Sequence, residues 1–162
     1  MKQYTKFLGQ ALLSLLAMAF TSCNDIPVGY LQTENAAFTP NVIQAYRNVP
    51  EGDPHVDNGA PWTSLRIQGV AGTNPINYEY VGVKVADGAN AEAFTAEVKK
   101  GNIKVMGGIV QMFPQALKSL SNGKYTLTLR VYNEGHSALL EDIITFDVQD
   151  NMPEEVYYEE EP

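Results

Sequence analysis

The side chains best suited to bind a ligand are concentrated in one polar loop. Residues Glu51–Gly59 (EGDPHVDNG) include His55 and Asp57 among several turn-forming residues. Imidazole, carboxylate and amide groups hydrogen-bond to sugar hydroxyls, and oxygen ligands also bind calcium. The loop does not have the alternating acidic ligands and the distant Glu of an EF-hand, which argues against calcium. Two interpretations remain, a sugar-binding loop that uses His55 and Asp57 and an ordinary solvated loop made of turn residues.

Three aromatic residues extend this candidate site. Trp62 borders the loop, and Tyr78 and Tyr80 lie on the next expected strand. An exposed aromatic face stacks on a sugar ring, so Trp62 with Tyr78 or Tyr80 would form a glycan-binding platform. The alternative is that Trp62 packs in the core and that the tyrosines line a half-buried strand. A strand residue of a sandwich usually packs, which favours this second interpretation for Trp62.

The sequence offers little for catalysis or metal chemistry. His55 and His136 are the only histidines, which excludes a multi-histidine metal centre. The chain has no Gly-x-Ser-x-Gly, His-Glu-x-x-His or phosphate-loop motif, and nothing pairs two carboxylates across a cleft. We therefore predict a protein that is not an enzyme, with no catalytic residue, no metal and no cofactor.

Cys23, the only cysteine, closes a secretory signal. A basic start is followed by the apolar run Phe7–Phe20, about 14 residues long, which is shorter than the about 20 residues of a membrane span. We predict that residues 1–22 are a cleaved signal peptide. The thiol of Cys23 would take a diacylglycerol thioether, and its freed amine would take a further acyl chain such as palmitate. Thr21-Ser22-Cys23 resembles the lipobox of bacterial lipoproteins.

The charge of the chain limits its partners. The formal net charge is −8, and removal of residues 1–22, whose only charges are two lysines, makes it −10. That sign argues against nucleic acid and against electrostatic docking on anionic lipid, so membrane attachment depends on the N-terminal lipid. A single cysteine cannot form an intramolecular disulfide, and we expect an exported domain stabilised by packing alone.

The mature chain divides into three parts. A lipidated tether is expected over residues 23–35, a β-domain over residues 36–149 and an acidic disordered tail over residues 150–162. Within the domain, turn signals separate short strands. These strands are expected over residues 37–47 at a sheet edge, 62–70, 76–85, 102–106, 109–113, 124–132 and 141–149.

Three segments carry more specific expectations. Alternation over residues 62–70 places Thr63, Leu65 and Ile67 on one face. A change of parity at Tyr80–Val81 predicts a bulge. Residues 89–100 are rich in Ala and Glu and end before a glycine, so they are either the one helix of the domain or a strand plus loop.

The last two strands give the clearest pattern. Residues 124–132 (KYTLTLRVY) alternate strictly, and residues 141–149 (EDIITFDVQ) do so with Asp142, Ile144, Phe146 and Val148 on one face. Residues 133–140, with Glu134 and His136, are expected as the loop between them. A G-x-Y-x-L-x-V strand followed by a T-F-x-V strand resembles the end of immunoglobulin-like and cadherin-like domains. With about seven strands, this implies an all-β fold, an antiparallel immunoglobulin-like β-sandwich.

A second resemblance covers most of the chain. The signal, the lipobox, Asn24-Asp25, the segment Gly29–Asn35 and a small sandwich together resemble Bacteroidetes outer-membrane lipoproteins. Many of these are accessory proteins of starch-utilisation-type glycan uptake systems. The resemblance implies an outer-membrane, lipid-anchored accessory protein, at the cell surface or on the periplasmic face, that binds polysaccharide or joins an outer-membrane transport complex. The alternative is a structural or assembly subunit that contacts another envelope protein and binds no small ligand.

Overall fold

The computed structural model describes residues 29–153. The predicted signal peptide, the lipidation site Cys23 and the beginning of the tether lie outside these residues, as do residues 154–162 of the predicted tail. The described chain is mostly β, with 48% strand and 14% helix in antiparallel and mixed sheets. The predicted all-β class is therefore confirmed.

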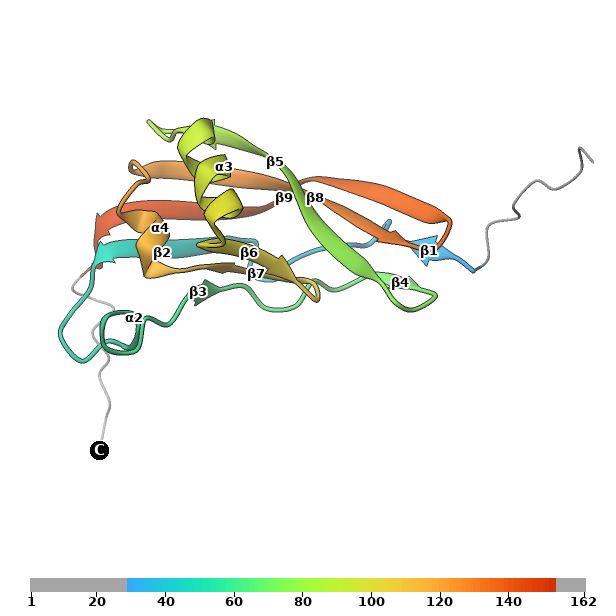
Figure 1. Cartoon of the computed structure of the whole chain (residues 1–162), viewed down its shortest axis with the longest axis horizontal. Coiled ribbons are helices and arrows are strands. Elements are labelled where there is room, and N and C mark those ends of the chain that lie inside the picture. The colour runs from blue at the N-terminus through green and yellow to red at the C-terminus, as the bar shows by residue number, and fades with distance from the viewer. Residues whose placement is uncertain (1–28, 154–162) are drawn as a thin grey trace, which may run out of the picture.

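The larger sheet has four strands in the order β2-β9-β8-β5. Its centre is the antiparallel hairpin of β8 (Gly123–Asn133) and β9 (His136–Asn151). β5 (Asn77–Ala86) pairs antiparallel with β8. β2 (Val42–Asn48) pairs parallel with the other side of β9, so the larger sheet is mixed and the prediction of a purely antiparallel fold is wrong here. These long strands run along the long axis of the molecule (Figure 1).

Two smaller sheets complete the β-structure. The first has the order β3-β7-β6, with the hairpin of β6 (Ile103–Met106) and β7 (Ile109–Met112) pairing with β3 (Trp62–Thr63). The second is the antiparallel pair of β1 (Leu31–Gln32) and β4 (Ala71–Gly72). The turn of the β6–β7 hairpin is Gly107-Gly108, as predicted, and both glycines have positive φ.

Within residues 29–153, three helices lie outside the sheets. They are α2 (Pro54–Asp57), α3 (Ala91–Lys100) and α4 (Pro114–Leu117). In Figure 1 the described chain enters beside β1 at one end of the long axis, whereas α2, α4 and the last residues of β9 lie at the opposite end. We call this second location the α2–α4 end.

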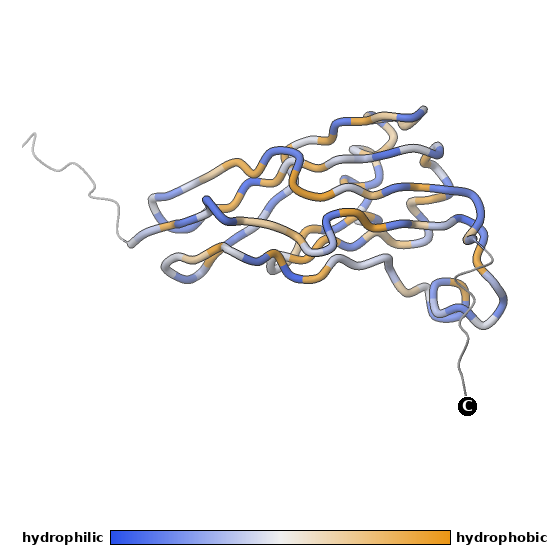
Figure 2. Tube along the Cα trace, turned by 180° about the vertical axis from the view of Figure 1, so that it is seen from behind, coloured by the Kyte–Doolittle hydropathy of each residue, from blue (hydrophilic) through white to orange (hydrophobic). Residues whose placement is uncertain are grey.

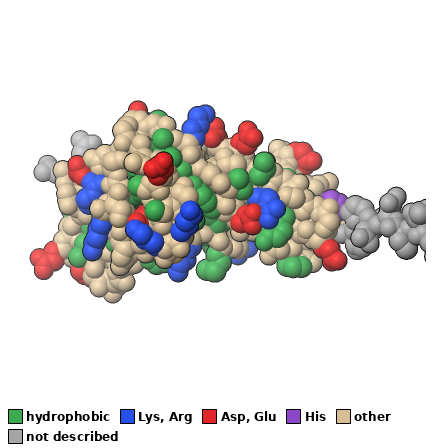
Figure 3. Space-filling model, turned by 45° about the horizontal axis from the view of Figure 1, so that its top comes forward, with side chains coloured by type: hydrophobic (Ala, Val, Ile, Leu, Met, Phe, Trp, Pro, Cys, Tyr) green, Lys and Arg blue, Asp and Glu red, His purple; other side chains and the backbone are tan. Residues whose placement is uncertain are grey.

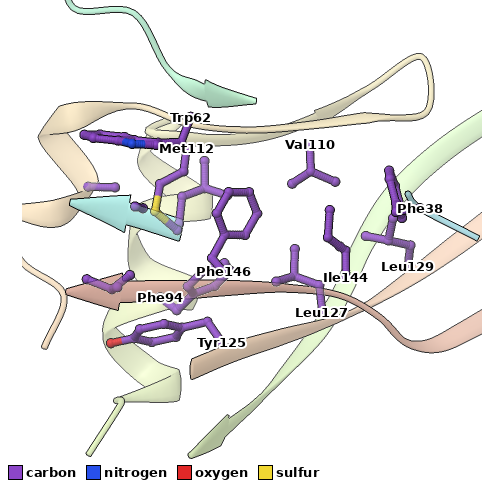
Figure 4. Packing of buried hydrophobic residues seen from close by; sticks show 14 of the residues in the cluster. Phe38, Trp62, Phe94, Val110, Met112, Tyr125, Leu127, Leu129, Ile144 and Phe146 are labelled. Carbon is purple, nitrogen blue, oxygen red and sulfur yellow. The ribbon is translucent and has the colours of Figure 1, made fainter. Parts of the chain in front are cut away.

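One hydrophobic core fills the space between the two larger sheets (Figure 4). Hydrophobic and hydrophilic residues alternate along the strands (Figure 2), because successive side chains of a strand point to opposite faces. Burying a Leu or Phe side chain fully contributes about 1.5–3 kcal/mol to the stability of a fold, relative to leaving it exposed. The fully buried side chains therefore dominate the stability of this fold. Those supplied by the two central strands are Tyr125, Leu127, Leu129, Val131, Ile144, Phe146 and Val148.

The helix over residues 91–100 settles the alternative that the sequence left open. Asn90 caps its start, accepting hydrogen bonds from the backbone N–H groups of Glu92 and Ala93. Gly101 ends it with φ 79°, a left-handed conformation that favours glycine. Phe94 anchors the helix in the core, stacked on Tyr125 at 5.1 Å between ring centroids.

The predicted strand over residues 62–70 is wrong beyond Thr63. The backbone N–H groups of Ser64 and Ile67 donate hydrogen bonds to the carbonyls of Val110 and Gly108. Two residues thus lie between the bonded positions on this segment, and only one lies between them on the β6–β7 hairpin. The extra residue reverses the parity of the side chains. Leu65 is therefore exposed while Ile67 is buried, and the two do not share a face.

The last hairpin also differs from its prediction. Residues 133–140 are not a loop: β9 begins at His136, which pairs with Asn133, and only Glu134 and Gly135 form the turn. Asp142 does not join the buried face of β9; it is exposed at φ 50°, beside a register shift between β8 and β9. β9 continues to Asn151, into the region predicted as tail.

Two further expectations hold with changes. The first long strand is an edge strand, as predicted, but it begins at Val42, after the cis bond between Thr39 and Pro40. The bulge predicted at Tyr80–Val81 is confirmed by a register shift between Tyr80 and Gly82.

Candidate functional site

The polar loop of residues 51–59 folds around α2. Asp53 caps this short helix, and Pro54 occupies its first turn, where a missing N–H costs nothing. The Asp53 carboxylate accepts a hydrogen bond from the backbone N–H of His55 (2.8 Å) and lies 2.6 Å from Nδ1 of the same residue. Asp53 thus fixes the orientation of the imidazole and leaves its Nε2 atom available.

His55 in turn covers Trp62. The two rings stack with their centroids 4.2 Å apart and their planes 19° from parallel. Trp62 pairs with Met112 across the sheet and is only 7% exposed, so the indole forms the edge of the core (Figure 4). The part of the stack that can meet a ligand is therefore mainly the half-buried imidazole of His55.

A hollow of about 380 Å³ opens beside this stack at the α2–α4 end. We call it the end hollow. It combines apolar side chains with an imidazole, a guanidinium, an amide and an ammonium group, the mixture typical of small-ligand sites. Its lining residues are Arg47, His55, Val56, Gly59, Trp62, Pro114, Gln115, Leu117 and Lys118.

Arg47 holds the walls of the end hollow together. Its guanidinium donates hydrogen bonds to the backbone carbonyls of Leu117 (3.1 Å) and Leu120 (2.7 Å). It also contacts the side chains of Asn122 and Asp150. Arg47 on β2 thereby ties the end of α4 to the end of β9, and the position of Lys118 follows from that tie.

The electrostatics of the stack keep one carboxylate ionised behind it. Burial by itself raises the pKa of Asp53, but hydrogen bonds from the backbone and ring of His55 outweigh this and lower the pKa below its usual value. Asp53 does not line the end hollow. The negative charge therefore lies behind the imidazole rather than in the hollow.

The two tyrosines lie in a different depression. Tyr78 and Tyr80 line a shallow groove of about 390 Å³ between β5 and β6, which we call the β5–β6 groove. Tyr80 hydrogen-bonds through its hydroxyl to Thr95 of α3 (2.9 Å). Burial raises the pKa of Tyr78, against a smaller opposite effect of Arg66.

The structure therefore divides the predicted site residues into two groups. His55 and Trp62 meet in the end hollow, and Tyr78 and Tyr80 meet in the β5–β6 groove; the two depressions share no lining residue. Asp57 is exposed at the end of α2 and lines neither. The single platform of Trp62 with the tyrosines is not assembled.

Sequence analysis did not identify three polar residues of the end hollow. Arg47 is on β2, just before the polar loop, whereas Gln115 and Lys118 belong to α4 and its C-terminal cap, far from residues 51–62 in sequence. No motif marks them. The only local signal of α4 is Pro114, because proline is favoured in the first turn of a helix.

Residues 29–153 contain neither a cluster of metal ligands nor a helix able to span a membrane. In this range no group of three or more His, Cys, Asp or Glu residues is placed to hold a metal ion. None of the helices in the same range has the length and apolar composition to cross a bilayer.

Charged side chains of both signs are interspersed on the face drawn in Figure 3, with apolar side chains exposed between them.

Comparisons of this chain with protein-family models, with curated proteins and with solved structures found no match.

Proposed function

We propose that this chain is a non-enzymatic, lipid-anchored envelope protein, an accessory component of a polysaccharide-uptake system that binds glycan in its end hollow. The observation that carries the proposal is the position of the hollow. It lies at the end of the long axis opposite to the point where the described chain enters (Figure 1).

The topology supports an immunoglobulin-like sandwich. In such domains strands B, E and D face strands C, F and G. Here β3, β7 and β6 occur in the order of B, E and D, and β5, β8 and β9 in that of C, F and G. β2 takes the place of strand A but pairs with β9 rather than with β3.

A side-chain detail supports the same fold. Immunoglobulin-like domains carry a tyrosine near the start of strand F whose hydroxyl bonds to the backbone a few residues upstream. Tyr125, near the start of β8, is fully buried and donates a hydrogen bond to the carbonyl of Ser121 (2.9 Å). The hydroxyl also accepts the backbone N–H of Asn90 (3.3 Å).

The proposed anchor would orient the domain. If Cys23 carries lipid, the short segment to Gly29 spans at most about 20 Å when extended. The β1–β4 end would then face the membrane, and the end hollow would face away from it, where a polymer is accessible (Figure 1). A Cys23→Ser variant should move from the membrane fraction to the soluble fraction, and retention in the membrane would contradict the lipid anchor.

The lining of the end hollow suits a sugar. Val56 is exposed and apolar, the imidazole of His55 presents an aromatic face, and Gln115 offers both a donor and an acceptor. Sugars combine apolar ring faces with hydroxyl groups, so they use both kinds of contact.

Affinity electrophoresis tests the proposal. The chain from Asn24 to Pro162 contains every described residue and would be run in native gels that hold one polysaccharide each. We expect retardation by at least one polysaccharide. The double variant Val56→Ala/Gln115→Ala should lose about fivefold or more in affinity, because it removes one hydrogen-bonding group and one apolar contact.

The matched control is Val81→Ala/Leu139→Ala. These two side chains are exposed like Val56 but lie on the outer face of the larger sheet. The control should bind like the wild type. Absence of retardation by every polysaccharide, or equal loss in both double variants, would remove glycan binding from the end hollow.

One observation favours the alternative of an assembly subunit. Among the described residues β5 and β6 each pair on one side only, and Met106, the last residue of β6, is 67% exposed. Unpaired edges of this kind can accept a strand of another protein. A stoichiometric partner that co-purifies with the wild type but not with Val105→Pro, a change on the edge strand β6, would favour this function.

A further inference from the structure

We infer that the glycan held by the end hollow is acidic, with carboxylate or sulfate groups on its sugars. The inference deepens the function proposed above and rests on it. It concerns the chemical class of the ligand, which the sandwich fold and the presence of a hollow do not determine.

The first argument is the composition of the lining. Arg47 and Lys118 are basic, His55 is an imidazole, and none of the nine lining residues is Asp or Glu. The chain as a whole has 19 acidic and 11 basic residues, so a lining without carboxylates departs from the rest of the surface. The chain's net negative charge also means that a local contact, rather than long-range attraction, must select an anion.

The second argument is the placement of the compensating carboxylates. Asp53 contacts the Nδ1 side of His55, and Asp150 contacts the guanidinium of Arg47. Neither carboxylate lines the hollow. Each therefore orients a nitrogen-bearing group from behind, an arrangement that directs donors toward a ligand while the acceptors stay out of its way.

The third argument is the state of the donors. Arg47 donates four hydrogen bonds, which leaves one of its five N–H groups without a partner among residues 29–153. Lys118 is exposed, and within the same range its ammonium makes no hydrogen bond or ion pair. Lys118 is the free cation at the rim, and Arg47 is mainly a positioning residue that fixes α4 beneath it.

Matched polymers test the charge directly. Polygalacturonate would be compared with its fully methyl-esterified form, which has the same backbone without the charge, and dextran sulfate with dextran. We expect retardation by at least one acidic member and about tenfold weaker binding of its neutral counterpart, because a charge-assisted hydrogen bond is lost. The first pair reports on carboxylates and the second on sulfates.

Variants locate the effect. Lys118→Gln should weaken binding of the acidic polymer about tenfold, and Lys118→Arg should restore it. Lys84→Gln, which makes the same change of net charge on the outer face of the larger sheet, should leave binding within about twofold, since exposed distant charges are screened. Raising the salt concentration should weaken binding of the wild type and have less effect on Lys118→Gln.

The outcomes separate the two proposals. Equal retardation by the charged and neutral members, with no effect of Lys118→Gln, overturns the acidic ligand and leaves glycan binding in place. Retardation by none of the four polymers also overturns the acidic ligand. The proposed function is lost as well only if the wider panel of neutral polysaccharides gives no retardation.

Discussion

The C-terminal hairpin and the segment of residues 49–70 hold their shapes by different means. In β8 and β9 a long antiparallel ladder carries a row of fully buried side chains. Residues 49–70 have only the two-residue strand β3 and the four-residue helix α2. Instead of a ladder, separate pairwise contacts hold this segment, among them Asp53 with His55, His55 with Trp62, and Ser64 with Val110.

This difference separates stability from ligand chemistry. Hydrophobic residues alternate along the hairpin, whereas the region of α2 is mostly hydrophilic (Figure 2). Burial of the hairpin stabilises the whole fold, and the irregular segment places polar groups on a rigid support. Changes in the hairpin should therefore reduce stability, and changes in the segment should reduce binding while the fold persists.

The largest effect is expected in the hairpin. Phe146→Ala removes a fully buried side chain from β9 and leaves a cavity, which should cost about 3–5 kcal/mol of unfolding free energy. Urea denaturation measures the loss. The exposed change Val81→Ala should stay within about 0.5 kcal/mol. A cost below about 1.5 kcal/mol for Phe146→Ala would mean that the hairpin does not carry the core.

A smaller, pH-dependent effect is expected at Glu97 of α3. Its side chain is 1% exposed and accepts hydrogen bonds from Lys100 and Asn102, both at 2.7 Å. Burial by itself raises the pKa of Glu97, but the hydrogen bonds of Asn102, Lys100 and Ser119 and the charge of Lys100 outweigh it and lower the pKa.

Ionised Glu97 therefore contributes stability above the unfolded-state pKa of about 4.5. The contribution is lost as the pH falls through the lower folded-state pKa. Glu97→Gln should cost about 1.5–3 kcal/mol at pH 7 and progressively less on acidification below pH 4.5. Thermal melts of both proteins from pH 7 to pH 3 measure this, and a constant difference across that range would contradict it.

Tyr125→Phe should cost somewhat less, about 1–2 kcal/mol. The change keeps the aromatic packing on Phe94 and removes only the hydroxyl that Ser121 and Asn90 share. Tyr132→Phe, a change to a half-exposed tyrosine at the other end of β8, serves as the control. Equal stability of the two variants would count against a structural role of the Tyr125 hydroxyl.

The smallest effect on stability is expected at His55. His55→Ala removes the stack on Trp62, worth about 0.5–1.5 kcal/mol, and leaves the core otherwise intact. Trp62 is the only tryptophan, so its fluorescence should shift to the red as the indole meets water. A fall in stability as large as that of Phe146→Ala would show that the stack belongs to the core rather than to the site.

The regular half of this molecule was predictable from sequence, and particular residues show why. Along β8 a period of two places Tyr125, Leu127 and Leu129 on one face whatever the neighbouring strands do. The helix over residues 91–100 carries its own stop at Gly101. Both signals are local, but the second left a strand plus loop open as the alternative, which the packing of Phe94 in the core decides.

The end hollow was only half predictable. The polar loop and Trp62 are neighbours in sequence, so His55 and Trp62 could be placed together in advance.

One extra residue between Ser64 and Ile67 reverses the parity that alternation predicts, and nothing in the sequence marks it. Lys118 reaches the hollow because Arg47 bonds to the backbone at the end of α4, a long-range contact that local patterns do not contain.

The most direct test of glycan binding at the α2–α4 end is a ¹⁵N–¹H NMR titration of the chain from Asn24, first with the acidic oligosaccharide oligogalacturonate and then with neutral oligosaccharides. We predict that the largest shift changes occur at residues 53–62 and 114–118, including the indole N–H of Trp62. Shift changes confined to the β5–β6 groove, or an unchanged spectrum with every oligosaccharide at millimolar concentration, would contradict the account.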